Sequence, residues 1–140
     1  MTARLEHANL SVTDVDAMLG FIRTAFPEFR VRHDSGRADP ERWVHVGDAD
    51  TYIALNRVRA AASPRTPSYN TPGFNHVGFV VEDLDALRAR LLAGGYREDP
   101  SPKQHPARRR AYFRDPQGEE WEFIQYLSAD KEQQNDYLLK

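Results

Sequence analysis

The stretch Tyr112-Phe-Arg-Asp-Pro-Gln-Gly-Glu-Glu-Trp-Glu-Phe-Ile-Gln-Tyr126 has the pattern of a β-hairpin. Its middle, Asp115-Pro116-Gln117-Gly118, is a turn, because Asp bonds nearby backbone, Pro presets the bend and Gly adopts the left-handed conformation. From Glu120 to Tyr126 the residues alternate between two faces. Trp121, Phe123 and Gln125 share one face; Glu120, Glu122, Ile124 and Tyr126 share the other.

Glu122 is the unusual residue of this hairpin, because it is a carboxylate in the middle of a strand, between Trp121 and Phe123. Carboxylates are rarely buried unless they are paired, hydrogen-bonded or bound to a metal. Two interpretations remain open from this stretch alone: a metal ligand, or a residue on a strand face that water covers.

The rest of the chain has the pattern of two βαβββ modules, an α+β organisation. We expect a first module at residues 1–58, a proline-rich linker at 59–72, a second module at 73–127 and a polar tail at 128–140. In the first module the strands are expected at 4–12, 28–34, 42–46 and 51–58, with a helix that Asp14 caps and Pro27 ends. In the second they are expected at 74–81, 96–98, 109–114 and 120–126, with a helix from Asp83 to Gly94. The tail is either a short helix or frayed.

The two modules contain a repeat. A shift of 69 positions (76 − 7) places His7 on His76, Asp14 on Asp83 and Ala17 on Ala86 without a gap. Each first strand therefore carries a histidine at the same place before the same type of helix start. Such a repeat indicates two copies of one supersecondary unit packed together.

Composition excludes several classes of function. The formal net charge of −2 lacks the excess of positive charge that is typical of proteins that bind nucleic acid or an anionic membrane. The chain has no cysteine, which excludes disulfides, thiolate metal sites and cysteine nucleophiles. No apolar run approaches the roughly 20 residues that a membrane span needs, and the N-terminus lacks a signal-peptide core, so we expect a cytoplasmic protein.

Two imidazoles and one carboxylate, His7, His76 and Glu122, form the candidate metal site. If the two modules pack about a pseudo-twofold axis, the equivalent histidines face the same space, and the last strand adds the carboxylate. This donor set suits one divalent ion, Fe, Mn, Ni, Co or Zn, in Lewis-acid or oxygen chemistry.

The chain resembles the vicinal oxygen chelate superfamily of glyoxalase I, fosfomycin-resistance transferases, bleomycin-resistance proteins and extradiol dioxygenases. The resemblance runs from Leu5 to about Leu127 and is carried by the two His-strand-to-Asp-helix junctions and the closing hairpin. It implies two βαβββ modules that form a cup-shaped, mainly antiparallel sheet around a divalent metal, with ligands at His7, His76 and Glu122. Glyoxalase I uses a carboxylate where this chain has Ala54, which disfavours that activity.

The resemblance and strand parity suggest further site residues. Tyr112 is expected to act in catalysis by bonding a metal-bound oxygen, or else to fill the cup. Arg110 is expected to hold an anionic group, or else to be solvated. Trp43 and His45 alternate with valines, and Trp43 is alternatively a core residue. His33 and His105 lie in loop-like contexts and receive no role. The expected substrate-binding residues are Asn9, Trp43, His45, Tyr52 and Arg110.

Three functions remain open. The first is a metal-dependent dioxygenase- or lyase-like enzyme, acting on a small oxygenated or aromatic molecule that the metal chelates. The second is a metal-free protein of the bleomycin-resistance type that sequesters a small aromatic compound, and the third is self-association alone. We expect a small-molecule substrate, no nucleic acid or membrane partner, and a homodimer, whose metal site is built within one chain or across two.

Overall fold

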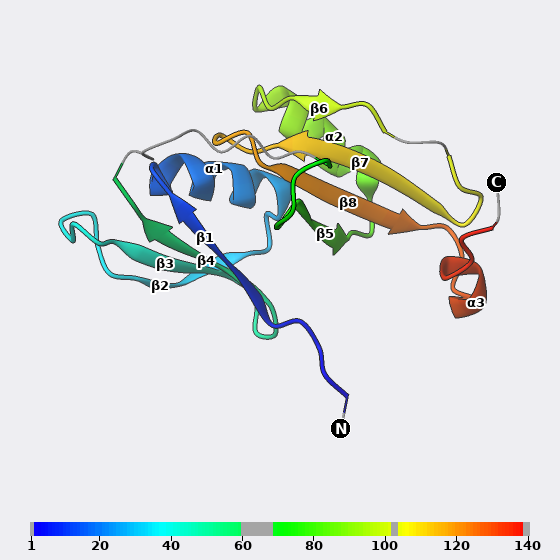
Figure 1. The fold of residues 1–140 in the computed structure, drawn as a ribbon, viewed down its shortest axis with the longest axis horizontal. Coiled ribbons are helices and arrows are strands. Elements are labelled where there is room, and N and C mark those ends of the chain that lie inside the picture. The colour runs from blue at the N-terminus through cyan, green and yellow to red at the C-terminus, as the bar shows by residue number, and fades with distance from the viewer. Residues whose placement is uncertain (1, 60–68, 102–103, 139–140) are drawn as a thin grey trace. The chain divides into compact units, whose positions relative to one another are not determined.

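The computed structural model describes residues 2–59, 69–101 and 104–138. The chain divides into two compact units, Met1–Arg65 and Thr66–Lys140. In the described residues each unit has a four-stranded mixed sheet and a main helix in the order βαβββ, which confirms the predicted α+β fold of two modules. Figure 1 shows the strands and helices of each unit along the chain.

The first unit contains β1 (His7–Val12), α1 (Val15–Ala25), β2 (Arg30–Asp34), β3 (Trp43–Gly47) and β4 (Tyr52–Arg57). The strand order is β1-β4-β3-β2, with β1 parallel to β4 and the other pairs antiparallel. Alternate residues of β3 and β4 are buried with the apolar face of α1, because their side chains point to the same side of the sheet. This core includes Val44, Val46, Ile53, Leu55, Met18, Phe21 and Ile22.

The second unit repeats this order with β5 (His76–Val80), α2 (Leu84–Ala93), β6 (Glu98–Asp99), β7 (Arg108–Arg114) and β8 (Glu120–Tyr126). Its strand order is β5-β8-β7-β6, and β5 is parallel to β8. The core lies between α2 and one face of this sheet, and includes Leu84, Leu87, Leu91, Ala111, Phe113, Trp121 and Phe123. The opposite face carries the candidate site residues.

The two helix starts are built identically, as the repeat predicts. Asp14 accepts a hydrogen bond from the Ala17 amide at 2.9 Å, and Asp83 accepts one from the Ala86 amide at 2.9 Å. Each bond satisfies an amide that the first helical turn leaves without a partner. The shared register thus places His7 and His76 at the same distance along the chain before a helix start.

The turn between β7 and β8 is organised by the buried Asp115. One of its carboxylate oxygens accepts from the amides of Gln117 and Glu119, and the other accepts from Trp121 Nε1 at 3.0 Å. Gly118 has φ +85°, a conformation that favours glycine. Asp115 therefore joins the turn to the core tryptophan.

Several boundaries differ from the sequence expectations. The first strand of each unit begins at its histidine, His7 or His76, because the preceding residues have no ladder partners. The short strand expected at 96–98 lies at Glu98–Asp99, where it pairs with β7. Residues 60–68 of the expected linker, residues 102–103 between β6 and β7, and residues 139–140 of the tail lie outside the described residues.

The tail contains a short helix, α3 (Lys131–Gln134), which one of the two expectations anticipated. His105, which we placed in a loop without a role, is buried and anchors this tail: its Nε2 donates to the Asp136 carbonyl at 2.8 Å, and its Nδ1 accepts from the Ala107 amide. Over the described ranges, none of the helices combines the length and apolar character needed to cross a membrane.

Candidate metal centre

His76 and Glu122 meet on the open face of the second sheet. His76 Nε2 lies 2.9 Å from Glu122 Oε2, although the residues are 46 positions apart in the chain. The side chains are only 27% and 14% exposed, which excludes the interpretation of Glu122 as a fully solvated strand residue. Gly78 is the ladder partner of Glu122, and a Cβ at that position would lie 3.9 Å from Glu122 Oε2, an ordinary contact.

Both candidate histidines are oriented by the residue that precedes them. His76 Nδ1 lies 2.7 Å from Asn75 Oδ1, and His7 Nδ1 lies 3.0 Å from Glu6 Oε1. When the Nδ1–H group donates a hydrogen bond to such an oxygen, the lone pair of Nε2 is available for a metal ion. The two modules thus repeat an orienting contact as well as a histidine.

The oxygens around His76 favour a cation. Both ring nitrogens of His76 lie within hydrogen-bond distance of an oxygen atom, Asn75 Oδ1 at Nδ1 and Glu122 Oε2 at Nε2. The 2.9 Å separation also suits adjacent ligands, because two donors about 2.1 Å from an octahedral ion lie about 3 Å apart. The donors present therefore fit a divalent ion.

The structure brings together two of the three predicted ligands. Across residues 2–59, 69–101 and 104–138, no three His, Asp or Glu side chains are grouped closely enough to hold an ion. His7 belongs to the first unit, while His76 and Glu122 belong to the second. The participation of His7 stays a prediction.

Tyr112 is a polar neighbour of the pair. It is the ladder partner of Glu122, it is buried, and its ring lies 6.0 Å from that of His76. Burial and the hydrogen bond to Glu122 both raise the pKa of Tyr112. The phenol therefore stays protonated at neutral pH and donates a hydrogen bond to the carboxylate.

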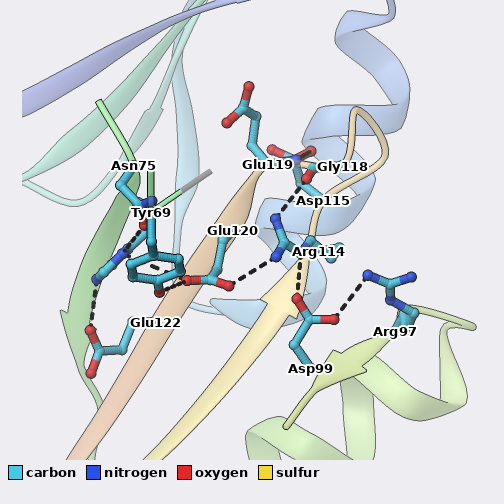
Figure 2. A network of polar contacts seen from close by, with 11 residues as sticks. Tyr69, Asn75, Arg97, Asp99, Arg114, Asp115, Gly118, Glu119, Glu120 and Glu122 are labelled. Carbon is cyan, nitrogen blue, oxygen red and sulfur yellow. Dashed lines mark hydrogen bonds and ion pairs between the residues drawn. The ribbon is translucent and has the colours of Figure 1, made fainter. Parts of the chain in front are cut away.

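Sequence reasoning missed Glu120, the second carboxylate of this site. Figure 2 shows it between Tyr69 and Arg114. Its Oε1 also lies 3.6 Å from His76 Nδ1. The hydrogen bond from Tyr69 to this carboxylate is the main cause that raises the tyrosine pKa to about 12. The alternation placed Glu120 on the face of Glu122, but no local pattern indicated its partners.

The first sheet has different residues at the equivalent positions. Asn9 pairs with Ala54 as Gly78 pairs with Glu122, so the ladder places Ala54 where the second unit has its carboxylate. Ala54 is buried and offers no ligand atom. Asn9 instead accepts a hydrogen bond from Asn56, on the open face of the sheet.

A row of aromatic rings crosses this first sheet. His7 stacks on Tyr52 with centroids 4.7 Å apart, and Tyr52 lies 4.6 Å from His45. Trp43 lies 5.1 Å from His45 and stacks on His33 at 4.1 Å. Trp43 is 39% exposed and so is not a core residue, and His33 lies in β2, within the strand expected at 28–34.

Burial and a neighbouring arginine affect two members of this row, His45 and Tyr52. Burial is the main cause that lowers the pKa of His45, and the positive charge of Arg32 lowers it further. The Arg32 guanidinium lies over the Tyr52 ring, 4.4 Å from its centroid, a favourable cation–π contact. The row is therefore aromatic, with one cationic group, Arg32, over it. Arg110, the remaining predicted substrate residue, is half-buried on β7 of the other unit.

The sequence model of the Glyoxalase/Bleomycin resistance protein/Dioxygenase superfamily matches residues 4–123. The chain belongs to this superfamily. The resemblance inferred from the two histidine strands and the closing hairpin is thereby confirmed. No curated protein sequence matches the chain.

Solved structures of the superfamily share the fold. The fosfomycin resistance protein FosX from Mesorhizobium loti has a TM-score of 0.70 at 21% identity, covering 97% of this chain and 100% of its own. A glyoxylase/bleomycin resistance protein/dioxygenase domain from Frankia sp. EAN1pec has a TM-score of 0.71 at 22% identity, covering 90% and 99%. A variant of FosX from Listeria monocytogenes, complexed with Mn(II) and 1S,2S-dihydroxypropylphosphonic acid, has a TM-score of 0.67 at 20% identity, covering 97% and 100%. At these identities the likeness shows the fold.

Proposed function

We propose that this superfamily member is a divalent-metal-dependent enzyme acting on a small molecule through adjacent oxygens, with dioxygenase- or lyase-like chemistry. His76 and Glu122 are two of its metal ligands and His7 is the third, supplied by the same chain or by a second copy in a homodimer. The proposal rests mainly on the 2.9 Å contact between His76 Nε2 and Glu122 Oε2. The Mn(II) in a FosX neighbour agrees with metal use in the superfamily.

The residues around the pair have distinct roles in this proposal. A bound divalent ion supplies Lewis acidity toward substrate oxygens. Tyr112 holds a proton at its phenol oxygen and steadies Glu122 by hydrogen bonding. Arg110, on the same strand, binds an anionic group of the substrate. Ala54 leaves the first unit without a carboxylate at the equivalent position, which disfavours a glyoxalase I reaction that needs a base there.

Metal counting tests the proposal. Metal-free protein is loaded separately with Mn(II), Fe(II), Co(II), Ni(II) or Zn(II), dialysed, and measured by elemental analysis. We expect about one ion per chain, lost in Glu122→Ala and kept in Glu132→Ala, which removes an exposed carboxylate of α3. An ion content that Glu122→Ala leaves unchanged, or no retained ion at all, would refute this site.

Activity screens then separate the reaction classes. With the retained metal, oxygen uptake in the presence of catechols reports dioxygenase chemistry, and consumption of an epoxide without oxygen uptake reports addition chemistry. His7→Ala should abolish whichever activity is found while leaving the second unit folded, because His7 lies in the first unit.

The aromatic row favours a second candidate, metal-free binding of a small aromatic compound. Trp43 is exposed whereas Trp121, the other tryptophan, is buried, so ligand-dependent quenching of fluorescence reports mainly on Trp43. In the presence of a chelator, benzoate should quench it and the saturated analogue cyclohexanecarboxylate should not, since only the flat ring stacks. Equal responses to the two acids would rule out stacking on this row.

A further inference from the structure

Glu120 is a buried carboxylate that takes no part in ligation in the proposed function. Its side chain is 7% exposed, and both oxygens are occupied: Tyr69 Oη donates to Oε1, and Arg114 Nη2 donates to Oε2 at 3.0 Å. Removing a carboxylate from water is costly unless partners compensate it, and here two partners do so. Glu120 is therefore hydrogen-bonded to Tyr69 and Arg114, while Glu122 contacts His76.

Arg114 is itself held from several sides. Its Nη1 donates to the Gly118 carbonyl at 3.1 Å, and its Nε donates to Asp99, which also accepts from Arg97 (Figure 2). These contacts join the turn before β8 and the short strand β6 to Glu120. The guanidinium is consequently a fixed counter-charge, which restricts the positions open to the Glu120 carboxylate.

Glu120 lies beside the ring of His76. The two residues are ladder partners in the parallel pair of β5 and β8, and Glu120 Oε1 is 3.6 Å from His76 Nδ1. Glu122 approaches the opposite nitrogen, Nε2. The two carboxylates therefore lie at opposite nitrogens of the imidazole. Glu120, near Nδ1, is paired with Arg114, and Glu122, near Nε2, is available to an ion.

In the first unit, an aromatic residue occupies the position equivalent to Glu120. Tyr52 is the ladder partner of His7, as Glu120 is of His76, and it stacks on the His7 ring with an interplanar angle of 14°. In both units the residue opposite the histidine thus contacts or faces its ring. His7 is stacked on an aromatic ring, and His76 lies beside a hydrogen-bonded carboxylate.

We propose that Glu120, held by Tyr69 and Arg114, is a positioning residue that sets the ring orientation of His76 for metal binding. We call Tyr69, Glu120 and Arg114 the Glu120 clamp. Asn75 Oδ1 lies within hydrogen-bond distance of His76 Nδ1, and the Glu120 charge 3.6 Å away reinforces this contact, so that Nε2 points toward Glu122 and the proposed ion site. The part of this inference that concerns metal affinity rests on the proposed function; the part that concerns ring orientation does not.

Two clamp variants and one matched control test the inference. Glu120→Gln keeps an acceptor for Tyr69 but removes the charge, and Tyr69→Phe removes only the hydroxyl. Glu98→Gln is the control, because it makes the same change in another Arg-paired glutamate of the second unit, bonded to Arg88 at 2.6 Å. Thermal unfolding of each variant verifies that it is folded.

The first readout is Mn(II) affinity, from the paramagnetic resonance signal of free Mn(II). Changes in the groups that orient a metal-binding histidine weaken affinity by roughly 10–100-fold. We expect a loss in this range for Glu120→Gln, a smaller loss for Tyr69→Phe and none for Glu98→Gln. Wild-type affinity in Glu120→Gln, or equal losses in Glu120→Gln and Glu98→Gln, would overturn the positioning role.

The second readout is the nitrogen resonances of the His76 ring in metal-free protein. Both clamp variants should shift them, and Glu98→Gln should not. If wild-type protein binds no Mn(II) while these resonances shift, the proposed function fails and the clamp stands. If wild-type protein binds Mn(II) and the resonances of both clamp variants are unchanged, the clamp fails and the proposed function stands.

Discussion

Tyr112 acts on the site through Glu122. Its phenol is buried and hydrogen-bonded to that carboxylate, and both effects raise its pKa. At neutral pH the phenol is therefore a permanent hydrogen-bond donor. A donor of this kind restricts the rotamer of the carboxylate, as the proposed metal site would require.

Tyr112→Phe should weaken metal binding while changing the fold little. Because the aromatic ring still fills the buried space and only the hydrogen bond to Glu122 is lost, we expect roughly tenfold weaker Mn(II) binding. Titration calorimetry would measure it. Tyr126→Phe, on the neighbouring strand, is the control, and equal affinity in the two variants would show that the Tyr112 hydroxyl has no role in ligation.

Asp115 shows how one buried side chain supports a turn. Burial raises its pKa, although the hydrogen bonds from Trp121 and three backbone amides oppose this effect. Because the folded-state pKa lies above the ordinary value, the charged carboxyl carries a stability penalty above the folded pKa, and the penalty disappears as pH falls below the ordinary value. A neutral acceptor should therefore serve almost as well.

Asp115→Ala should lower the free energy of unfolding by about 3 kcal/mol, because it leaves the buried Trp121 Nε1 and the turn amides without an acceptor. Asp115→Asn should cost clearly less, since its amide oxygen still accepts a hydrogen bond. Denaturant unfolding of the two variants tests this expectation. If the Asn variant is as unstable as the Ala variant, the charge itself is what the turn requires.

Helix α1 is joined to the strands of its unit by a buried arginine. Arg42, 5% exposed, makes a bidentate pair with Asp34 of β2 and also bonds Asp16 in the first turn of α1. The Arg42 hydrogen bonds are the main cause that lowers the Asp34 pKa to about 2. The same arginine therefore connects the far edge of the sheet with the start of the helix.

Asp34→Asn should destabilise the protein in a pH-dependent way. A depressed folded-state pKa adds stability that is fully present above the ordinary value of 3.8 and is lost as pH falls toward 2. We expect a deficit of about 1–2 kcal/mol at pH 7 relative to the natural chain. Unfolding measured at pH 7, 4 and 2.5 should show this deficit shrinking.

The comparison for that series is Asp50→Asn, which changes an exposed aspartate whose ion pair with Arg4 is on the surface. It should show no deficit at any of these pH values. A deficit for Asp34→Asn that stays constant down to pH 2.5 would contradict the ion pair as the source of the stability.

For the whole chain, metal binding and folding should be linked. Because an ion held by His76 and Glu122 binds only the folded protein, a free metal concentration 100 times the dissociation constant should add about 2.7 kcal/mol to the free energy of unfolding. Thermal unfolding with and without Mn(II) tests this. The gain should vanish in Glu122→Ala, and a gain that survives there would locate the metal elsewhere.

Local patterns accounted for most of the architecture. The helix starts at Asp14 and Asp83, the turn at Asp115–Gly118 and the alternation of β8 all depend on neighbours a few residues away, so the sequence alone predicted them. The repeat then indicated two modules, and with the hairpin it indicated the superfamily. Strand starts were less accurate, because a strand begins where a partner strand begins.

The sequence by itself determined the two-module fold and made His76 and Glu122 candidate ligands, since residue type, spacing and caps are encoded along the chain. Only the tertiary structure decided that His76 faces both Glu120 and Glu122, that Tyr69 reaches Glu120 across 51 positions, and that five rings form a row on the first sheet. The physical reason is register. Cross-strand partners come from segments distant in the chain, and their pairing is set by how both strands pack on a common core rather than by the local pattern of either one.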